Sequence, residues 1–189
     1  MKWTLPNILT VFRLLSAPLV AAVFVLFYRP AADWIALALF VAASITDYID
    51  GYLARAWNQG TKMGTMLDPI ADKAMVLIAL MVIVGTATPD MTYALMFPAG
   101  LILFREVFVS GLREFLGDVA GTLKVTKLAK WKTTAQMVAL TELFVAGIYG
   151  FPALQWLGLG LLWLAAALTV LSGLDYFTKA LPFLKEEDA

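Results

Sequence analysis

Residues 47–73 read DYIDGYLARAWNQGTKMGTMLDPIADK, and this stretch places four aspartates between two long apolar runs. They are Asp47, Asp50, Asp68 and Asp72. A carboxylate at membrane depth costs roughly 2.5–3.5 kcal/mol on insertion scales, so ionisable residues kept there usually mark a site. Four of them close together favour bound cations, and the residues between them indicate which chemistry those cations serve.

The composition of the whole chain restricts both the class of protein and the kind of metal. Of the 189 residues, 61% are hydrophobic, which is typical of an integral membrane protein. Histidine and cysteine are absent, which excludes disulfides, zinc or copper sites of the usual nitrogen and sulfur type, and Ser–His–Asp or Cys–His catalysis. A metal in this protein must therefore be a hard cation bound by oxygen, such as Mg²⁺, Mn²⁺ or Ca²⁺.

Six apolar segments each approach the roughly 20 residues that a membrane-spanning helix needs. We expect these helices at about 6–28, 33–56, 65–86, 92–117, 132–150 and 153–178. The predicted fold is all-α, an integral membrane bundle of six transmembrane helices that forms a single domain over residues 1–189.

The lysines and arginines predict how this bundle is oriented. Of the fourteen, only Arg29 falls in the first, third or fifth link between segments. Loops on the cytoplasmic side carry the excess of basic residues. We therefore expect the N- and C-termini and the link within residues 47–73 to face the cytoplasm.

Helical spacing gathers the polar residues of this stretch on two helix faces. The first face carries Asp47, Asp50, Gly51, Ala54 and Arg55, and the second carries Gly64, Asp68 and Asp72. Because the link between the two helices is short, they should be antiparallel neighbours. The four carboxylates can then converge near the cytoplasmic surface.

Converging carboxylates are unstable without cations. Two like charges about 5 Å apart repel by roughly 3 kcal/mol at an effective dielectric near 20. One or two divalent cations can cancel this repulsion, and two metals close together suit phosphoryl transfer because they hold the attacking and leaving oxygens.

Gly51, Ala54 and Gly64 leave room for a bulky ligand, although small residues also serve ordinary packing of membrane helices. The planar guanidinium of Arg55 can donate two parallel hydrogen bonds to a phosphate.

The pattern D-x-x-D-G-x-x-A-R-x8-G-x-x-x-D-x-x-x-D resembles the signature of the CDP-alcohol phosphatidyltransferase family, and the chain matches its eight fixed positions across 26 residues. The resemblance implies a six-helix enzyme of the bacterial inner (cytoplasmic) membrane, usually a homodimer, with a two-metal site facing the cytoplasm. Members of the family transfer a phosphatidyl group from a CDP-linked lipid to an alcohol and release CMP. The resemblance implies no nucleic-acid partner.

The resemblance also implies roles for the residues of the signature. The four aspartates would bind two ions, Mg²⁺ or Mn²⁺, and Asp72 would also be the base that takes the proton from the acceptor hydroxyl. The CDP moiety would contact Gly51, Ala54, Arg55 and Gly64.

Four further residues resemble the nucleotide side of the family's site. Thr61 is similar to the family's hydroxyl contact to the diphosphate, and a helix N-cap is an equally good interpretation of it. Asn7, Thr10 and Arg13 form one polar stripe of the first segment, and such stripes usually face the interior of a bundle. We therefore include them among the candidate contacts to the CDP-lipid.

Basic residues of the fourth segment bear on the acceptor alcohol. Arg105 and Arg113 are eight residues apart and share a helix face. The neighbouring Glu106 and Glu114 are best interpreted as internal ion-pair partners. The two arginines are better explained as an anion site, which suggests an acceptor that carries a phosphate.

Three stretches make that suggestion more specific. LPNILTVFRLL, REVFVSGLREF and KWKTTAQMVAL resemble the corresponding stretches of bacterial family members that use glycerol 3-phosphate. By this resemblance the phosphate of glycerol 3-phosphate would be held by Arg105, Arg113, Lys130 and Lys132.

The sequence thus predicts an enzyme that transfers the phosphatidyl group of CDP-diacylglycerol to glycerol 3-phosphate by direct, metal-assisted displacement. Its products would be phosphatidylglycerophosphate and CMP. The alternative within the family is another phosphorylated acceptor, such as inositol phosphate. The alternative from another class is a divalent-cation transporter, but Arg55, Arg105 and Arg113 would repel its cargo.

Overall fold

The computed structural model describes residues 4–56, 61–117 and 127–185. These residues form six α-helices: α1 (Leu5–Leu26), α2 (Ala31–Ala56), α3 (Lys62–Thr86), α4 (Pro89–Leu116), α5 (Lys127–Tyr149) and α6 (Pro152–Lys185). The all-α prediction is confirmed, and each helix covers one of the six expected segments. Of the described helices, α1, α4 and α6 are long and apolar enough to cross a membrane by length and composition.

Two helices extend furthest beyond the ranges predicted from hydropathy. The α5 helix begins at Lys127 rather than near 132, and α6 continues to Lys185 rather than ending near 178. In α6 the extension still packs against the bundle, because Ala180 is fully buried. Lys179 also pairs with Asp175 one turn earlier, with 2.7 Å between Nζ and Oδ2.

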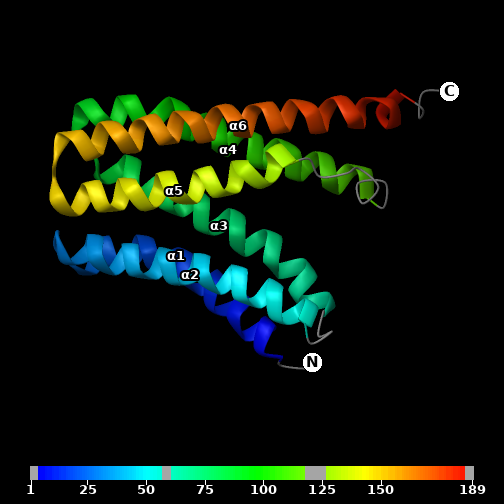
Figure 1. The fold of residues 1–189 in the computed structure, drawn as a ribbon, viewed down its shortest axis with the longest axis horizontal. Helices are drawn as coiled ribbons and strands as arrows, with labels where there is room; N and C mark the ends of the chain where they lie inside the picture. The colour runs from blue at the N-terminus through cyan, green and yellow to red at the C-terminus, as the bar shows by residue number, and fades with distance from the viewer. Residues whose placement is uncertain (1–3, 57–60, 118–126, 186–189) are drawn as a thin grey trace.

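The helices lie side by side along one long axis. The start of α1 and the end of α6 lie at one end of the bundle, where α2 also ends and α3 begins, and the link between α5 and α6 lies at the opposite end (Figure 1). The most extensive packing joins α5 to α6, α1 to α2, α1 to α3 and α4 to α6. The aspartates therefore lie in the half of α2, and in the half of α3, that is nearer to this end.

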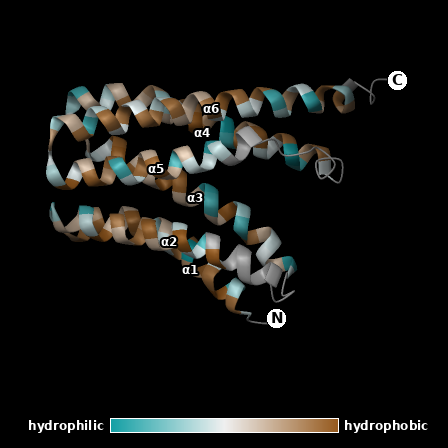
Figure 2. Ribbon diagram, in the orientation of Figure 1, coloured by the Kyte–Doolittle hydropathy of each residue, from teal (hydrophilic) through white to brown (hydrophobic). Residues whose placement is uncertain are grey.

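Hydrophobic residues run along most of the length of each helix, both inside and outside the bundle (Figure 2). The core includes the fully buried Phe40, Leu140 and Leu162, and the ring of Phe40 packs 5.7 Å from that of Phe144. Large apolar side chains also cover the outside, including Phe104, which is 66% exposed. Such an exterior is unusual for a water-soluble protein but suits contact with lipid.

An ion pair stabilises the end of the bundle opposite the start of α1 and the end of α6. Arg29 donates to both carboxylate oxygens of Asp33, at 2.6 and 2.8 Å, and to the carbonyl oxygen of Thr86 at 2.8 Å. These hydrogen bonds to Asp33 raise the pKa of the Arg29 guanidinium above its ordinary value. Gly147 of α5 lies against the pair, which we call the Arg29–Asp33 clamp. The clamp joins the α1–α2 link, the end of α3 and α5.

We expect Gly147→Ala to destabilise the protein by about 1–3 kcal/mol. A Cβ at this position would lie 2.7 Å from Arg29 Nη2 and 3.0 Å from Asp33 Oδ1. The guanidinium cannot move aside without losing hydrogen bonds to Asp33 or Thr86. The measurement is thermal unfolding of the purified protein in detergent.

Gly100→Ala is the matched control, because a Cβ at Gly100 of α4 would meet nothing within 4 Å. That change should leave the melting temperature unchanged or raise it slightly, since alanine favours helix over glycine. Equal melting temperatures for the two variants would contradict the role of the clamp.

Candidate active site

Three of the four predicted aspartates meet around one buried arginine. Arg13 of α1 is 2% exposed, and its Nη1 lies 2.7 Å from Asp72 Oδ1. The same guanidinium forms an ion pair with Asp47, and its Nη2 lies 3.4 Å from Asp68 Oδ1. The structure thus brings carboxylates of α2 and α3 together, as their helical spacing predicted. We call Arg13, Asp47, Asp68 and Asp72 the carboxylate cluster.

The polar stripe of α1 holds the start of α3 in place. Thr10 donates a hydrogen bond of 2.8 Å to Asp68 Oδ1, one turn away from Arg13. Thr61 donates a hydrogen bond of 2.6 Å to Asn7 Oδ1 and accepts one of 3.0 Å from the amide of Gly64. The N-cap interpretation of Thr61 is therefore confirmed. Its contact to a diphosphate stays a prediction.

Gly64 lets the two helices approach closely at this point. A Cβ there would lie 3.2 Å from Asn7 Oδ1 and 3.4 Å from Thr61 Oγ1, tighter than ordinary packing allows. The glycine thus has a packing role in addition to the ligand contact that the resemblance implies.

Five predicted site residues cannot be placed at the level of side chains. Their backbone belongs to α2 or α5, but their side-chain surroundings lie outside the described part of the structure. They are Asp50, Gly51, Ala54, Arg55 and Lys130. Their predicted roles therefore stay predictions.

The basic residues of α4 and α5 line a cavity of about 250 Å³. Arg105, Arg113 and Lys132 all border it, as does Lys73 of α3. Among its described lining residues, the one acidic side chain is Glu106. Four cations and one carboxylate give this cavity a formal charge of +3, which favours an anion. We call it the basic cavity.

Glu106 and α6 hold the basic residues in position. Glu106 Oε1 lies 3.2 Å from Arg105 Nη1 and also forms an ion pair with Lys132. This confirms the interpretation of Glu106 as an internal partner. Arg105 Nη2 donates a hydrogen bond of 3.3 Å to Ser172 Oγ, and the guanidinium of Arg113 lies 5.0 Å from the ring centre of Tyr176.

The carboxylate cluster and the basic cavity form one continuous polar site. A second cavity of about 290 Å³ is bordered by Asp68 and Asp72 on one side and by Lys73, Arg113 and Lys132 on the other. The last three residues also line the basic cavity. A small anion in the basic cavity would therefore lie beside the carboxylates.

Two residues of this site are not evident from the sequence. Lys73 directly follows Asp72, forms a hydrogen bond with Ser110 Oγ and adds a cation to the basic cavity. Its position next to a signature aspartate is the signal that could have identified it. Gly173 of α6 makes room for Arg105, because a Cβ there would lie 2.9 Å from Arg105 Cγ. No local pattern connects a glycine in α6 with an arginine in α4.

The carboxylate cluster has the chemistry of a site for a hard cation. Its acidic ligand atoms are all carboxylate oxygens, which Mg²⁺ and Mn²⁺ prefer. The side chains of Asp47, Asp68 and Asp72 are between 41% and 45% exposed, so oxygen atoms remain open to a ligand. In the part of the chain that is described, no three acidic side chains are arranged to hold a metal ion by themselves. Arg13 forms an ion pair with each of the three carboxylates.

Comparison with known proteins identifies the family to which this sequence belongs. The sequence model of the CDP-alcohol phosphatidyltransferases matches residues 3–171. The chain belongs to the CDP-alcohol phosphatidyltransferase family. Enzymes of this family generally depend on divalent metals. Membership confirms the resemblance found in residues 47–73 and argues against a cation transporter.

Similar CDP-alcohol phosphatidyltransferases cover the chain almost from end to end. A protein of Cereibacter sphaeroides is 54% identical over 99% of this chain and 100% of its own length. One from Rickettsia bellii is 43% identical over 92% and 93%, and one from Salmonella choleraesuis is 36% identical over 95% and 96%. All three are named CDP-diacylglycerol–glycerol-3-phosphate 3-phosphatidyltransferase.

We expect Arg13→Gln to destabilise the protein by about 2–4 kcal/mol when a chelator removes divalent metal. The change leaves three neighbouring carboxylates without the guanidinium that they surround. Saturating Mg²⁺ or Mn²⁺ should restore most of the lost stability, because a divalent cation supplies the missing positive charge. The measurement is thermal unfolding with EDTA and with metal.

Arg13→Lys keeps the positive charge and serves as the control. In EDTA it should lose less stability than Arg13→Gln. If Arg13→Gln lost the same stability with and without metal, Arg13 would have a packing role rather than an electrostatic one.

Proposed function

We propose that this protein is a membrane enzyme that transfers the phosphatidyl group of CDP-diacylglycerol to glycerol 3-phosphate. The products are phosphatidylglycerophosphate and CMP. The observation that carries the proposal is the basic cavity that opens directly beside the carboxylate cluster. The relatives named for this reaction support it over nearly the whole chain.

The fold supports a specific placement in the membrane. We assign all six helices as transmembrane spans of a single domain over residues 1–189, with both termini and the active site on the cytoplasmic side of the inner membrane. The apolar exterior, and the position of the start of α1 and the end of α6 at the same end of the bundle, support this assignment. A homodimer is assigned by analogy with the family.

The donor lipid is assigned to the carboxylate cluster. Asp47, Asp50, Asp68 and Asp72 would hold two ions, Mg²⁺ or Mn²⁺, which neutralise the diphosphate and favour departure of CMP. The acyl chains extend into the bilayer. The remaining candidate contacts to the CDP-lipid are Asn7, Thr10, Arg13, Gly51, Ala54, Arg55, Thr61 and Gly64.

The acceptor is assigned to the basic cavity. A phosphate monoester carries about −1.5 to −2 charges at neutral pH, which complements the formal charge of the cavity. Arg105, Arg113, Lys130 and Lys132 would hold this phosphate, and we add Lys73 to them because it lines the same cavity. The glycerol part then extends towards Asp72.

The reaction is a single displacement. Asp72 takes the proton of the 1-hydroxyl of glycerol 3-phosphate, and that oxygen forms a bond to the lipid-side phosphorus. The bond from this phosphorus to the oxygen shared with CMP breaks, and CMP leaves with the bonding electrons. Asp72 borders the cavity that joins the donor and acceptor sites, which supports its role as the base. Most of the lowering of the barrier comes from positioning and charge.

The test of this function is release of CMP from CDP-diacylglycerol by the purified protein with Mg²⁺ or Mn²⁺. Glycerol 3-phosphate should support turnover, whereas glycerol, serine and inositol phosphate should not. Asp72→Asn is the matched inactive variant, because an amide cannot take the proton. Turnover with inositol phosphate but not with glycerol 3-phosphate would overturn the acceptor assignment.

We expect Gly173→Ala to raise the KM for glycerol 3-phosphate about tenfold, equivalent to about 1.4 kcal/mol. The new methyl group displaces Arg105 from the basic cavity, whereas the donor site is unaffected. The KM for CDP-diacylglycerol should therefore stay the same.

Gly160→Ala in the same helix is the control, because a Cβ at Gly160 would meet nothing within 4 Å. Wild-type kinetics for Gly173→Ala would show that Arg105 does not contribute to acceptor binding.

A further inference from the structure

An apolar groove runs between α2 and α5, outside the polar site. It encloses about 530 Å³, and Leu161 of α6 forms part of its wall. Ile45 of α2 and Val138 of α5 border it and are 53% and 50% exposed, so the groove opens sideways to the surroundings of the bundle. We call it the α2–α5 groove.

The groove leads directly to the active site. On α2, Ser44 borders the groove and lies one helical turn before Asp47 of the carboxylate cluster. On α5, Met137 borders both the groove and the cavity that contains Asp68 and Asp72. A molecule with a polar end at the carboxylates and an apolar stem would therefore follow this groove into the bilayer.

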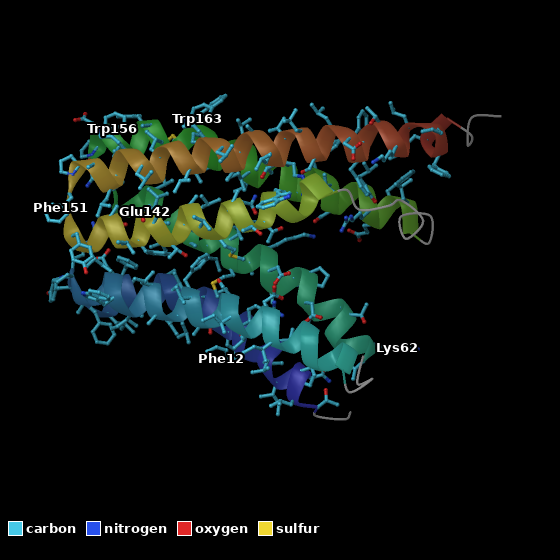
Figure 3. All side chains as sticks on the ribbon, viewed as in Figure 1. Phe12, Lys62, Glu142, Phe151, Trp156 and Trp163 are labelled. Atoms are coloured by element: carbon cyan, nitrogen blue, oxygen red, sulfur yellow. The ribbon has the colours of Figure 1, made fainter. Side chains whose placement is uncertain are left out.

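One polar group in the groove has no partner among the described residues. Glu142 Oε1 is buried and makes no hydrogen bond there, whereas the hydroxyls of Ser44 and Thr141 each donate to a backbone carbonyl at 2.8 Å. Glu142 lies on α5 in the half of the bundle towards Phe151, away from Lys62 (Figure 3). It is five residues beyond Met137, or about 7.5 Å along the helix.

We propose that the α2–α5 groove binds the diacylglycerol part of the donor lipid and that Glu142 donates a hydrogen bond to an ester carbonyl of that lipid. This rests on the proposed function, which supplies the lipid. The ester groups of a diacylglycerol lie between its phosphate and its acyl chains, and Glu142 likewise borders the groove beyond Met137, which also borders the cavity of Asp68 and Asp72. The first carbons of the acyl chain lie against Val138 and Ile45.

The direction of this hydrogen bond follows from the chemistry of the two groups. An ester carbonyl can only accept, so the carboxyl group must supply the proton. A buried polar atom without a partner is unfavourable, so a lipid that provides the partner is held more tightly than one that does not.

A comparison of ester and ether donors tests the proposal. CDP-dialkylglycerol has the same headgroup and chains as CDP-diacylglycerol but lacks the ester carbonyls. The wild type should use the ester donor roughly three- to tenfold more efficiently in kcat/KM, the value expected for one hydrogen bond. Glu142→Leu should bring this ratio close to one, and Glu142→Gln should keep it, because an amide still donates.

Thr141→Val is the matched control, since it removes a hydroxyl that is already bound to the backbone and should leave the ratio unchanged. An unchanged ester preference in Glu142→Leu would overturn the role of Glu142. If the wild type used neither donor, the proposed function would be refuted instead. Direct labelling would then test separately whether the groove binds the lipid.

Labelling of the wild-type protein uses CDP-diacylglycerol with a photoreactive diazirine in one acyl chain. The label should appear on peptides of α2 and α5, and unlabelled CDP-diacylglycerol should remove it. Label that resists competition, or competed label on other helices, would overturn the proposal.

A second copy of this chain in the groove is the other occupant to exclude. The protein has no cysteine, so Val138→Cys introduces a single thiol at the groove. This variant should stay monomeric on a denaturing gel after oxidation. A disulfide-linked dimer would show that another protomer covers the groove.

Discussion

One buried guanidinium joins three helices at the polar end of this bundle. Arg13 comes from α1, and the carboxylates around it come from α2 and α3. These carboxylates would otherwise repel one another, because like charges at short range interact unfavourably. Arg13 therefore makes it possible for the protein to keep several acidic side chains close together before any other cation arrives. Two hydrogen bonds also connect α1 with the start of α3: Thr10 donates to Asp68, and Thr61 donates to Asn7. Because hydrogen bonds depend on angle as well as distance, they orient groups that the ion pairs bring together.

The second constraint is the close approach of acidic and basic groups that we assign to different substrates. Lys73 and Asp72 are neighbours in sequence, yet Lys73 borders the basic cavity while Asp72 contacts Arg13. Glu106 keeps Arg105 and Lys132 from repelling each other, and still leaves the cavity positive. Under the proposed function, two anionic substrates could approach one another because each would meet its own set of cations. The chemistry then requires little more than a base between them.

Helical periodicity predicted much of this arrangement. The spacing of Asp47, Asp68 and Asp72 was enough to predict that they converge, because positions along one helix determine its faces. Contacts between helices far apart in sequence were not predictable in this way. Nothing near Gly173 indicates that Arg105 packs against it, and nothing near Glu142 indicates a groove formed with α2. Membership of a family with a known signature supplied the roles that periodicity alone left open.

The Arg29–Asp33 clamp also has a consequence for the geometry at the far end of the bundle. It fixes the α1–α2 link, the end of α3 and α5 at the end opposite the active site, and α1 and α2 diverge from α5 and α6 towards the other end (Figure 1). A helix of the length of α5 is about 35 Å long at 1.5 Å per residue. By that length, a tilt of about 3° at the clamp displaces the active-site end by about 2 Å. Small angular changes would thus open or narrow the space between the carboxylates and the basic residues, with the clamp as the pivot.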